Sequence, residues 1–280
     1  MNKVLILDGY NLIYRARHTA MNKGENSTIF NFFRSIRPLI EKFNPDIAYF
    51  VLEGVPKARI QADPNYKGQR VYTDKDDFRR QRREIISLIK SYYPFIVARH
   101  SDYECDDIVN YLANDKHQND EAVIISTDTD FIQSINENTR LYSPIRKKFI
   151  ESPEYDYVQW KALVGDKSDN IEGFKGIGDK RAKALLENSE KLNELLSTEE
   201  NLDKFKLNQF MIRFHDITEE QDNIEFTIPK EVPGWSSLKE IFSNYEFNSL
   251  VGKDSTWEKY INTFNNLERN LSNVSWKTIR

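Results

Sequence analysis

The sequence has few of the features that stabilise secreted or membrane proteins. Among its 280 residues there is one cysteine, Cys105, so no disulfide can form within the chain. The longest apolar runs, such as Val4–Leu7 and Val123–Ile125, are far too short to span a bilayer. The N-terminus enters a strand-like stretch directly, without the basic region and small-residue cleavage site of a secretory signal. We therefore predict a protein of a reducing, cytoplasmic compartment.

Repeats and nucleophile motifs are also missing. The sequence has no internal repeat and no low-complexity tract, and its four histidines are scattered (His18, His100, His117 and His215). No Ser/His/Asp set for nucleophilic catalysis stands out. Hydrophobic residues make up 39% and charged residues 30%, which is the balance of a globular protein with ample core material. The length allows one large domain, or a domain with a helical extension.

The charge is unevenly distributed along the chain. The net charge is −4, which does not by itself indicate a nucleic-acid partner. Residues 57–83 carry nine Lys/Arg against four Asp, a net charge of +5, whereas residues 187–225 carry eleven acids against four bases, a net charge of −7. A chain with separate charged regions can bind an anion at one of them. The alternative is that the basic residues only form a solvated helical face.

Apolar runs and helical patterns alternate over the first 150 residues. Strands are predicted at residues 4–7, 47–52, 95–98 and 122–126, with two short pieces around the basic turn at 146–148. Helical spacing separates them at residues 11–21, 29–43, 78–93 and 104–114. This alternation predicts an α/β fold with an open, mostly parallel sheet flanked by helices. From about residue 155 the pattern becomes mostly helical.

Acidic residues recur where the predicted strands end. They are Asp8, Glu53, Glu104, Asp106, Asp107, Asp128, Asp130, Asp166 and Asp169. In parallel sheets ligands bind at the carboxyl ends of the strands, so we expect these carboxylates to converge there. Converging carboxylates repel one another unless cations lie between them, and Mg²⁺ prefers oxygen ligands. The pattern predicts a site for two Mg²⁺ or Mn²⁺ ions that acts on phosphodiesters.

Each acidic motif has a simpler structural interpretation. Asp8 alone could cap the following helix, and Asp128-x-Asp130 could form an Asx turn. The acids at 104–107 could stabilise a helix N-terminus, although three acids exceed what capping needs. Asp166 and Asp169 could lie in a polar loop. Taken together, we favour the metal site.

Two further segments are predicted to bind phosphates. A glycine-rich stretch from Gly173 leads into a helix with Lys175, Gly176, Gly178, Lys180 and Arg181, where backbone and cations can approach a phosphate. A tight turn between packed helices is the alternative. In Tyr66-Lys67-x-x-Arg70, the tyrosine could stack on a base while the cations hold phosphates, or it could simply pack on the protein.

In order along residues 3 to 200, these motifs resemble those of the 5′-nuclease (flap endonuclease) superfamily, and most of all its stand-alone bacteriophage 5′–3′ exonucleases. They are Asp8-Gly9, Tyr66-Lys67-x-x-Arg70, Glu104-x-Asp106-Asp107, Ser126-Thr-Asp128-x-Asp130, Gly165-Asp166-x-x-Asp169 and Gly173-x-x-Gly176-x-Gly178-x-Lys180. The resemblance implies a PIN-like sheet at residues 1–155 and a helical part at 156–280. That part would contain a helix–three-turn–helix motif at about 160–186, which grips duplex DNA and binds K⁺.

The resemblance also implies roles for single residues. Asp8, Glu53, Glu104, Asp106 and Asp107 would serve a first metal ion, and Asp128, Asp130, Asp166 and Asp169 a second. Lys67 would stabilise charge on the scissile phosphate with Arg70 nearby, and Asp8 and Asp130 would be essential for catalysis. Residues 67–95, with Arg79 and Arg80, would form an arch for a 5′ single strand. Two positions depart from the family: Glu53 stands where Asp is usual, and Cys105 where alanine is usual.

The implied activity is a metal-dependent 5′–3′ exonuclease and 5′-flap endonuclease. Its partners would be DNA and RNA–DNA with 5′ flaps or ends, and replication proteins, in a bacterial or phage-infected cell. One alternative is a single-strand PIN ribonuclease, although such domains usually lack the glycine-rich duplex grip. Another is a DNA-junction binder without turnover, which only Glu53 favours.

Overall fold

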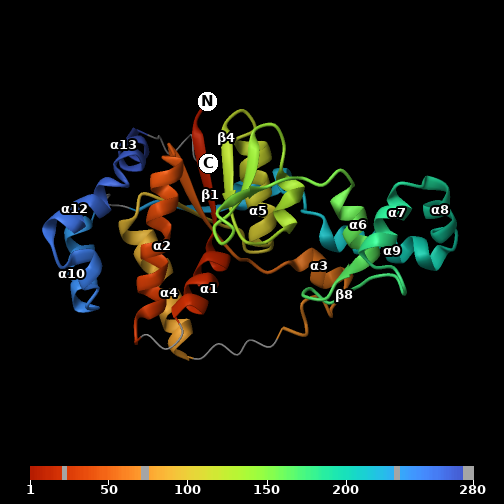
Figure 1. Ribbon diagram of the computed structural model, residues 1–280, viewed down its shortest axis with the longest axis horizontal. Coiled ribbons are helices and arrows are strands. Elements are labelled where there is room, and N and C mark those ends of the chain that lie inside the picture. The colour runs from red at the N-terminus through yellow and green to blue at the C-terminus, as the bar shows by residue number, and fades with distance from the viewer. Residues whose placement is uncertain (21–23, 71–75, 230–233, 274–280) are drawn as a thin grey trace. The chain divides into compact units, whose positions relative to one another are not determined.

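The computed structural model describes residues 1–20, 24–70, 76–229 and 234–273 (Figure 1). They form two compact units, neither continuous in the sequence. The sheet unit holds residues 1–54, 73–150 and 216–280, and the helical unit holds residues 55–72 and 151–215. No helix in the described part of the chain is both long and apolar enough to cross a membrane.

The sheet unit is built on a mostly parallel sheet, which confirms the predicted fold class. Within the described residues the sheet has seven strands in the order β6-β5-β4-β1-β2-β3-β9. The inner strands pair in parallel, while β6 and β9 run antiparallel at the two edges. The strands are β1 (Lys3–Asp8), β2 (Ile47–Leu52), β3 (Ile96–Arg99), β4 (Glu121–Ile125), β5 (Thr139–Ser143), β6 (Lys148–Ile150) and β9 (Glu225–Thr227).

The central strands are apolar along their whole length because both faces of the sheet are covered. Leu5 and Leu7 of β1 join a core shared with helices α1 (Gly9–Ala20), α2 (Ser27–Phe43) and α4 (Asp76–Tyr92). Their neighbours Val4 and Ile6 are equally buried, and side chains alternate between the faces of a strand. Burial on both faces is typical of parallel strands and explains the continuous apolar runs.

Helices cover the sheet unit and extend to its last described residues. They are α1 (Gly9–Ala20), α2 (Ser27–Phe43), α4 (Asp76–Tyr92), α5 (Cys105–Tyr111), α10 (Trp235–Asn244), α11 (Asn248–Val251), α12 (Asp254–Asn262) and α13 (Asn265–Asn273). A π-helical turn, Leu112–Lys116, continues α5. Trp257, Tyr260 and Phe264 are buried in the same core as the sheet. The described helices between residues 235 and 273 therefore pack in the core of the sheet unit, whereas the predicted division assigned them to a separate helical part from residue 156.

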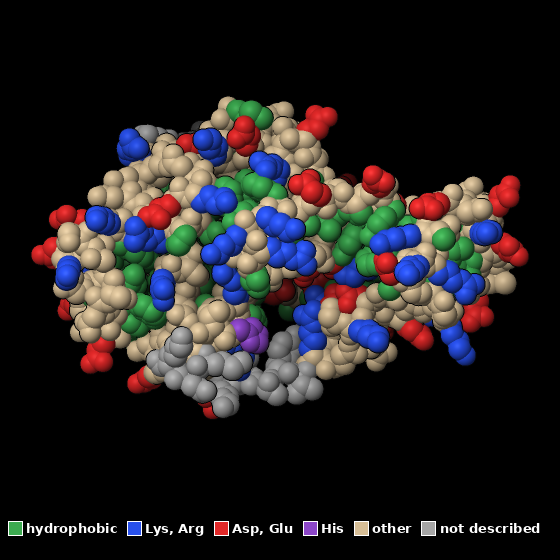
Figure 2. Space-filling model, in the orientation of Figure 1, with side chains coloured by type: hydrophobic (Ala, Val, Ile, Leu, Met, Phe, Trp, Pro, Cys, Tyr) green, Lys and Arg blue, Asp and Glu red, His purple; other side chains and the backbone are tan. Residues whose placement is uncertain are grey.

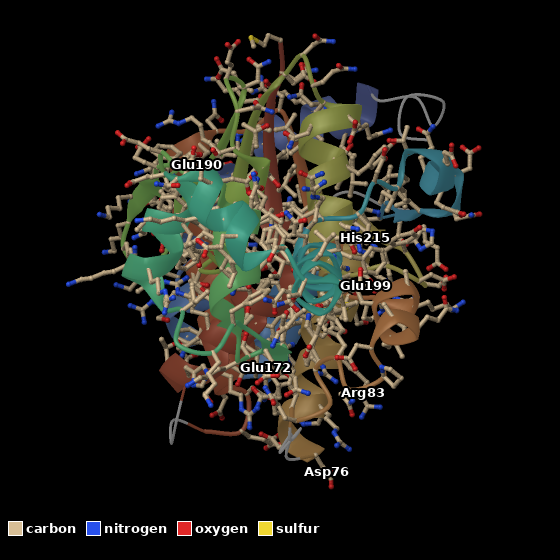
Figure 3. The ribbon with its side chains drawn as sticks, turned by 90° about the vertical axis from the view of Figure 1, so that its right-hand side faces the viewer. Asp76, Arg83, Glu172, Glu190, Glu199 and His215 are labelled. Carbon is tan, nitrogen blue, oxygen red and sulfur yellow. The ribbon has the colours of Figure 1, made fainter. Side chains whose placement is uncertain are left out.

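The helical unit contains the predicted helix–turn–helix. Its elements are α3 (Lys57–Ala62), α6 (Tyr157–Val164), β7 (Gly165–Asp166), β8 (Ile171–Glu172), α7 (Asp179–Leu186), α8 (Ser189–Leu195) and α9 (Glu199–Ile212). The turn between α6 and α7 is tight because Gly165 has a positive φ of 84° and a side chain at Gly173 would collide with Val164 O. The acidic residues Glu190 and Glu199 lie on α8 and at the start of α9 (Figure 3).

Candidate active site

Three adjacent parallel strands have polar residues at their carboxyl ends, and we call this end of the sheet the carboxylate edge. Asp8 is the last residue of β1, Glu53 follows β2, and Ser126 to Asp128 follow β4. β1 lies between β2 and β4, with Asp8 opposite Val51 and Leu7 opposite Ile125. The predicted convergence at the carboxyl edge is therefore present for these residues.

Asp8 is the buried centre of this edge. Its side chain is 6% exposed, accepts a hydrogen bond from Ser126 Oγ at 2.7 Å and accepts another from the backbone N–H of Asn11 at 3.1 Å. The bond from Asn11 caps the start of α1, which is the alternative role that the sequence analysis gave for Asp8. Burial, with a smaller contribution from the nearby charge of Asp128, raises the pKa of Asp8 to about 6 although its hydrogen bonds lower it. A bound cation would relieve both effects.

Ser126 connects the ends of β1 and β4. Its hydroxyl donates to Asp8 Oδ2 and accepts from the backbone N–H of Asp128 at 3.0 Å. Asn11 adds a second connection, because its Oδ1 accepts from the backbone N–H of Thr127 at 3.1 Å. The sequence prediction named neither Ser126 nor Asn11 as a site residue. The only available signal was their position beside the carboxylates.

Cys105 joins the end of β2 to the start of α5. Its backbone N–H donates to Glu53 Oε2 at 2.6 Å, and its thiol lies 3.8 Å from Asp8 Oδ1. Burial raises the pKa of the Cys105 thiol, with further contributions from Asp8, Glu53 and Asp106. The cysteine is thus a small buried residue that stays protonated among three of the predicted metal ligands, as expected of a structural thiol.

The remaining acids of the sheet unit also make local hydrogen bonds. Glu104 and Asp107 form a reciprocal capping box at the start of α5, in which the Glu104 N–H donates to Asp107 Oδ2 at 3.2 Å. Asp128 Oδ1 accepts from the backbone N–H of Asp130 at 2.9 Å, which is the geometry of an Asx turn. The simpler interpretations of these motifs are therefore present, and their metal role stays a proposal.

The donor set at this edge fits a hard divalent cation. The candidate ligands are carboxylate oxygens, which Mg²⁺ and Mn²⁺ prefer. Within the described ranges, no three His, Cys, Asp or Glu side chains lie close enough to form a ready-made cage around a metal ion. Mg²⁺ usually keeps several waters and uses only one or two carboxylates plus substrate phosphates, so the open arrangement is compatible with it.

In the helical unit, Lys67 and Arg70 are held against Asp169. Asp169 Oδ1 accepts from Arg70 at 2.5 Å, and Lys67 Nζ lies 3.8 Å from Asp169 Oδ2. The backbone N–H of Lys67, which has a positive φ of 55°, donates to Asp169 O at 3.0 Å. Asp166 pairs with Lys161 Nζ at 2.6 Å. The predicted metal ligands Asp166 and Asp169 thus pair with three cations of this unit.

Three predicted nucleic-acid contacts have other partners in the structure. Tyr66 is 7% exposed within the apolar core of the helical unit, and its hydroxyl donates to Asp169 Oδ2 at 3.3 Å. Of the two alternatives for Tyr66, the one in which it packs on the protein is present, and a contact with nucleic acid stays a prediction. Arg80 pairs with Asp77 at 2.8 Å, and Arg79 lies 3.9 Å from Asp76. Asp76 is the first residue of α4 (Figure 3). Residues 71–75 of the predicted arch lie outside the described part of the chain.

The glycine-rich turn before α7 is open enough for a phosphate to approach. Gly176 has a positive φ of 76°, and nothing lies within 4 Å of a side chain placed at Gly178. Lys175, Lys180 and Arg181 are exposed around it, and Arg181 also donates to Gly176 O at 3.5 Å. The structure brings these five predicted residues together, and their role in binding stays a proposal.

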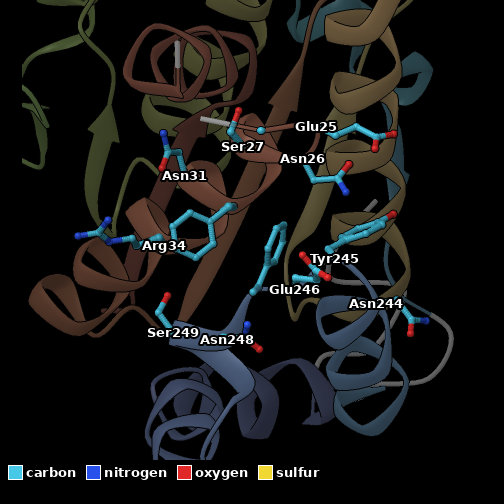
Figure 4. A pocket seen from close by; sticks show the side chains of 13 residues that line it. Glu25, Asn26, Ser27, Asn31, Arg34, Asn244, Tyr245, Glu246, Asn248 and Ser249 are labelled. Atoms are coloured by element: carbon cyan, nitrogen blue, oxygen red, sulfur yellow. The ribbon is translucent and has the colours of Figure 1, made fainter. Parts of the chain in front are cut away.

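The sheet unit also has a pocket away from the carboxylate edge. It has a volume of about 710 Å³ and lies between the start of α2 and the turn from α10 to α11 (Figure 4). Phe30 and Phe247 line it with their rings 5.2 Å apart. No predicted site residue lines this pocket.

The raised pKa of Asp8 gives a prediction for the metal-free protein. A rise from 3.8 to about 6 corresponds to a free energy of about 3 kcal/mol. The folded state holds the Asp8 proton more tightly than the unfolded state does. The loss of stability caused by ionising the buried carboxyl is therefore absent below pH 3.8 and complete above pH 6. In chelator, Asp8→Asn is expected to raise stability relative to the native sequence by roughly this amount more at pH 7.5 than at pH 4. Urea unfolding at both pH values measures the difference; an equal effect at both would contradict it.

Two family models cover most of the chain. One, described as the N-terminal resolvase-like domain of 5′–3′ exonucleases, matches residues 3–162, and the other, described as their C-terminal SAM fold, matches residues 152–232. The chain therefore belongs to the 5′–3′ exonuclease family, and the resemblance to the 5′-nuclease superfamily is confirmed. This family is a class of nucleases, which are hydrolases of phosphodiesters.

Individual relatives agree with this class. The chain is 27% identical over 289 residues to DNA polymerase I of Borreliella burgdorferi, a match that covers 93% of the chain and 31% of the relative. It is 28% identical over 214 residues to a 5′–3′ exonuclease of Mycoplasmopsis pulmonis, covering 71% of each. The chain thus spans about a third of the length of the polymerase relatives that it matches.

Solved structures share the fold. The bacteriophage T5 flap endonuclease, in a complex with DNA and metal ions, aligns with a TM-score of 0.62 at 19% identity and covers 95% of this chain and 99% of that one. The catalytic core of Rad2 in complex with DNA substrate aligns with a TM-score of 0.51 at 18% identity, covering 89% and 92%.

Proposed function

We propose that the chain is a divalent-metal-dependent nuclease that removes 5′ ends and 5′ flaps from DNA and RNA–DNA during replication. The observation that carries the proposal is the edge where Asp8 ends β1, and Glu53 and Asp128 follow the adjacent parallel strands β2 and β4. Asp8 is buried there beside Ser126 and Cys105. A buried residue with a purely structural role is rarely a carboxylate, because burying an ionised group without a charged partner is costly. The family membership supports the same chemistry.

The carboxylates would hold the metal ions, while the chain's own residues orient the substrate. Asp8, Glu53, Asp106, Asp128 and Asp130 would be the first candidates, with Glu104 and Asp107 acting through the α5 capping box. Bound Mg²⁺ or Mn²⁺ would supply activation of the attacking water and neutralisation of charge on the phosphate. Asp166 and Asp169, which pair with cations of the helical unit, stay predicted ligands of the second ion from the family resemblance. Lys67 would place a positive charge beside the scissile phosphate.

The glycine-rich turn would hold the duplex beyond the cleavage point. Gly176 and Gly178 leave room for the backbone to approach phosphates, and Lys175, Lys180 and Arg181 surround them. Bound K⁺ at this motif remains a prediction from the family resemblance. Arg79, Arg80 and the segment from residue 67 to 95 would guide the single strand.

The duplex grip predicts a change in salt dependence. Replacing Lys180 and Arg181 together by alanine is expected to weaken binding of a flap substrate about tenfold, because fewer counterions are released on binding. The slope of log affinity against log salt should flatten by about 2. Fluorescence anisotropy in chelator measures both quantities without cleavage. An unchanged slope would remove these two residues from the DNA contact.

A comparison of substrates tests the proposed function. A 5′-labelled flap duplex, a blunt duplex and an unstructured RNA are each incubated with the protein and Mg²⁺. Cleavage near the flap junction is the expected result. Preference for unstructured RNA would instead indicate a PIN-type ribonuclease, and tight flap binding without cleavage would indicate a junction-binding protein.

A further inference from the structure

We infer that Arg80 and Gln81 are positioning residues, which anchor the start of α4 to the start of α2 and so fix α4 beside the carboxylate edge. The inference rests on the proposed nuclease function and gives Arg80 an indirect part in guiding the strand. Both helices belong to the sheet unit and lie side by side (Figure 1). We call Asp77, Arg80 and Gln81 of α4 the α4 anchor.

The first turn of α2 is capped by α4 rather than by its own residues. A helix start leaves backbone N–H groups without partners in the helix, and an Asn at the N-cap usually accepts from one of them. Asn26 holds this position but makes no such bond. Gln81 Oε1 instead accepts from the backbone N–H groups of Thr28 at 2.9 Å and Ile29 at 3.3 Å. Because Gln81 is only 3% exposed, its loss would leave two buried N–H groups without an acceptor.

Arg80 extends the anchor to the segment before α2. Its guanidinium donates to Asn26 Oδ1 at 3.0 Å and to the carbonyl oxygen of Glu25 at 2.9 Å. The Asn26 oxygen that could cap α2 is thus bound to α4. Asp77 connects the two anchor residues, because its Oδ1 accepts from Arg80 at 2.8 Å and its Oδ2 accepts from Gln81 Nε2 at 2.7 Å. The anchor is therefore one continuous hydrogen-bond network between the two helix starts.

Apolar packing alone does not fix α4 in this way. Phe78 of α4 is buried against α1, with its ring centre 5.1 Å from that of Tyr14 and 4.2 Å from Arg17 Cζ. Hydrophobic contacts are non-directional, so they hold α4 on α1 without setting its position along or around its own axis. Hydrogen bonds to two adjacent N–H groups are directional and do set it.

The position of α4 matters because Arg82 lies next to the carboxylate edge. Its Cζ lies 5.5 Å from the centre of the Tyr10 ring, and Tyr10 follows Asp8 by two residues. Burial raises the pKa of Tyr10, the charge of Arg82 lowers it and the charge of Glu53 raises it, so both charges act near the Tyr10 hydroxyl. A shift of α4 would move Arg82 relative to a phosphate at this edge, and a displacement of about 1 Å can lower a rate about a hundredfold.

Arg80 differs from the cations that a phosphate would meet at the surface. Figure 2 shows Lys and Arg side chains exposed over the sheet unit. The Arg80 guanidinium is already directed to Asn26, Glu25 and Asp77. A phosphate contact would compete with these bonds, whereas a positioning role keeps all of them. The positioning role therefore predicts that removing Arg80 does not change how many counterions DNA releases on binding.

Three changes in the full chain test the anchor. Gln81→Met and Arg80→Met each remove one member. Asp77→Asn combined with Gln81→Glu exchanges the amide and the carboxylate, which keeps the net charge, the bond between the two side chains and an acceptor for Thr28 and Ile29. Arg80→Met changes a side chain that is 40% exposed, so it decides the question if Gln81→Met does not fold.

Arg37→Met is the matched control. It removes one positive charge and the ion pair with Glu41 from a position further along α2. Single-turnover cleavage of a 5′-flap duplex at saturating enzyme gives the rate constant, and anisotropy in chelator over a range of salt gives the affinity and its slope. Hydrogen exchange of the Thr28 and Ile29 amides reports on the anchor itself.

Gln81→Met and Arg80→Met are expected to cleave about tenfold more slowly or worse, with affinity within about threefold of the native sequence and an unchanged salt slope. The exchanged pair and Arg37→Met should keep the native rate constant. A slope flatter by about 1 in Arg80→Met would overturn the inference, because it would show a direct phosphate contact. Native rate constants in both single variants, or an exchanged pair as slow as Gln81→Met, would overturn it as well.

The anchor and the nuclease function can fail separately, because exchange and binding are measured without turnover. Absence of cleavage by the native sequence, with faster exchange of Thr28 and Ile29 in Gln81→Met, would reject the nuclease function and support the anchor. Normal cleavage by the native sequence, with native rate constants and native exchange in both single variants, would reject the anchor alone.

Discussion

Replacing Asp8 by asparagine is expected to reduce flap cleavage at least a thousandfold while substrate binding in chelator changes little. Asp8 is a buried carboxylate where β1 ends between β2 and β4, and asparagine keeps its shape but removes its charge. Loss of a metal ligand removes several kcal/mol of transition-state stabilisation, and about 4 kcal/mol corresponds to a factor of about a thousand. Single-turnover cleavage with saturating enzyme measures the rate constant apart from binding.

Asp46→Asn is the matched control for this variant. Asp46 precedes β2, at the opposite edge of the same sheet, and its carboxylate accepts bonds from Lys3, Asn266 and Asn270. Destabilisation of the fold would therefore affect Asp46→Asn at least as much. Comparable loss of cleavage in both variants would show that Asp8 acts through stability, and full turnover in Asp8→Asn would refute its metal role.

Replacing Lys67 by methionine is expected to lower the cleavage rate constant by about a hundredfold to a thousandfold with a small change in affinity. The Lys67 ammonium is held between Asp169 and the Tyr66 ring, whose centre lies 5.1 Å away, so its charge is positioned before substrate arrives. A preorganised charge contributes most where charge develops in the transition state. Methionine keeps the length of the side chain and removes only the charge.

Lys57→Met provides the comparison for Lys67, because Lys57 is exposed at the start of α3 in the same unit. It should leave the rate constant unchanged. If Lys67→Met instead weakened binding tenfold or more and left single-turnover cleavage intact, Lys67 would be a substrate-binding residue without a catalytic role.

The sheet could be predicted because strands that are buried on both faces have continuous apolar sequences. The runs at Val4–Leu7 and Ile47–Leu52 are continuously apolar, and each is followed directly by a carboxylate. The edge strand β9, Glu225–Thr227, is three residues long and has no such run, so it was missed. Helix α3 was missed for a related reason: it is short, and its buried residue is Arg59, which binds the carbonyls of Met211 and Arg213.

The site was only partly predictable, because a residue type does not specify its partner. Tyr66 and Lys67 are neighbours in a basic segment, yet the tyrosine is buried and bonds to Asp169, which lies 103 residues away. Glu104 and Asp107 have the spacing of metal ligands and of a capping box alike. Ser126 is identified as a site residue only by its hydrogen bond to Asp8, which depends on how β1 and β4 pair in the sheet. Each of the two units consists of segments that are separated in the sequence, and no local change in composition marks where one unit ends and the other begins.

The central claim is that the carboxylate edge of the sheet binds the catalytic divalent ions. Titration of Mn²⁺ into the metal-free protein, followed by calorimetry and by paramagnetic resonance of free Mn²⁺, tests it in the native sequence and in Asp8→Asn. Saturable binding that Asp8→Asn weakens at least tenfold, and that Asp46→Asn leaves intact, is the predicted result. Identical Mn²⁺ binding by all three proteins, or flap cleavage that persists in excess chelator, would contradict the account.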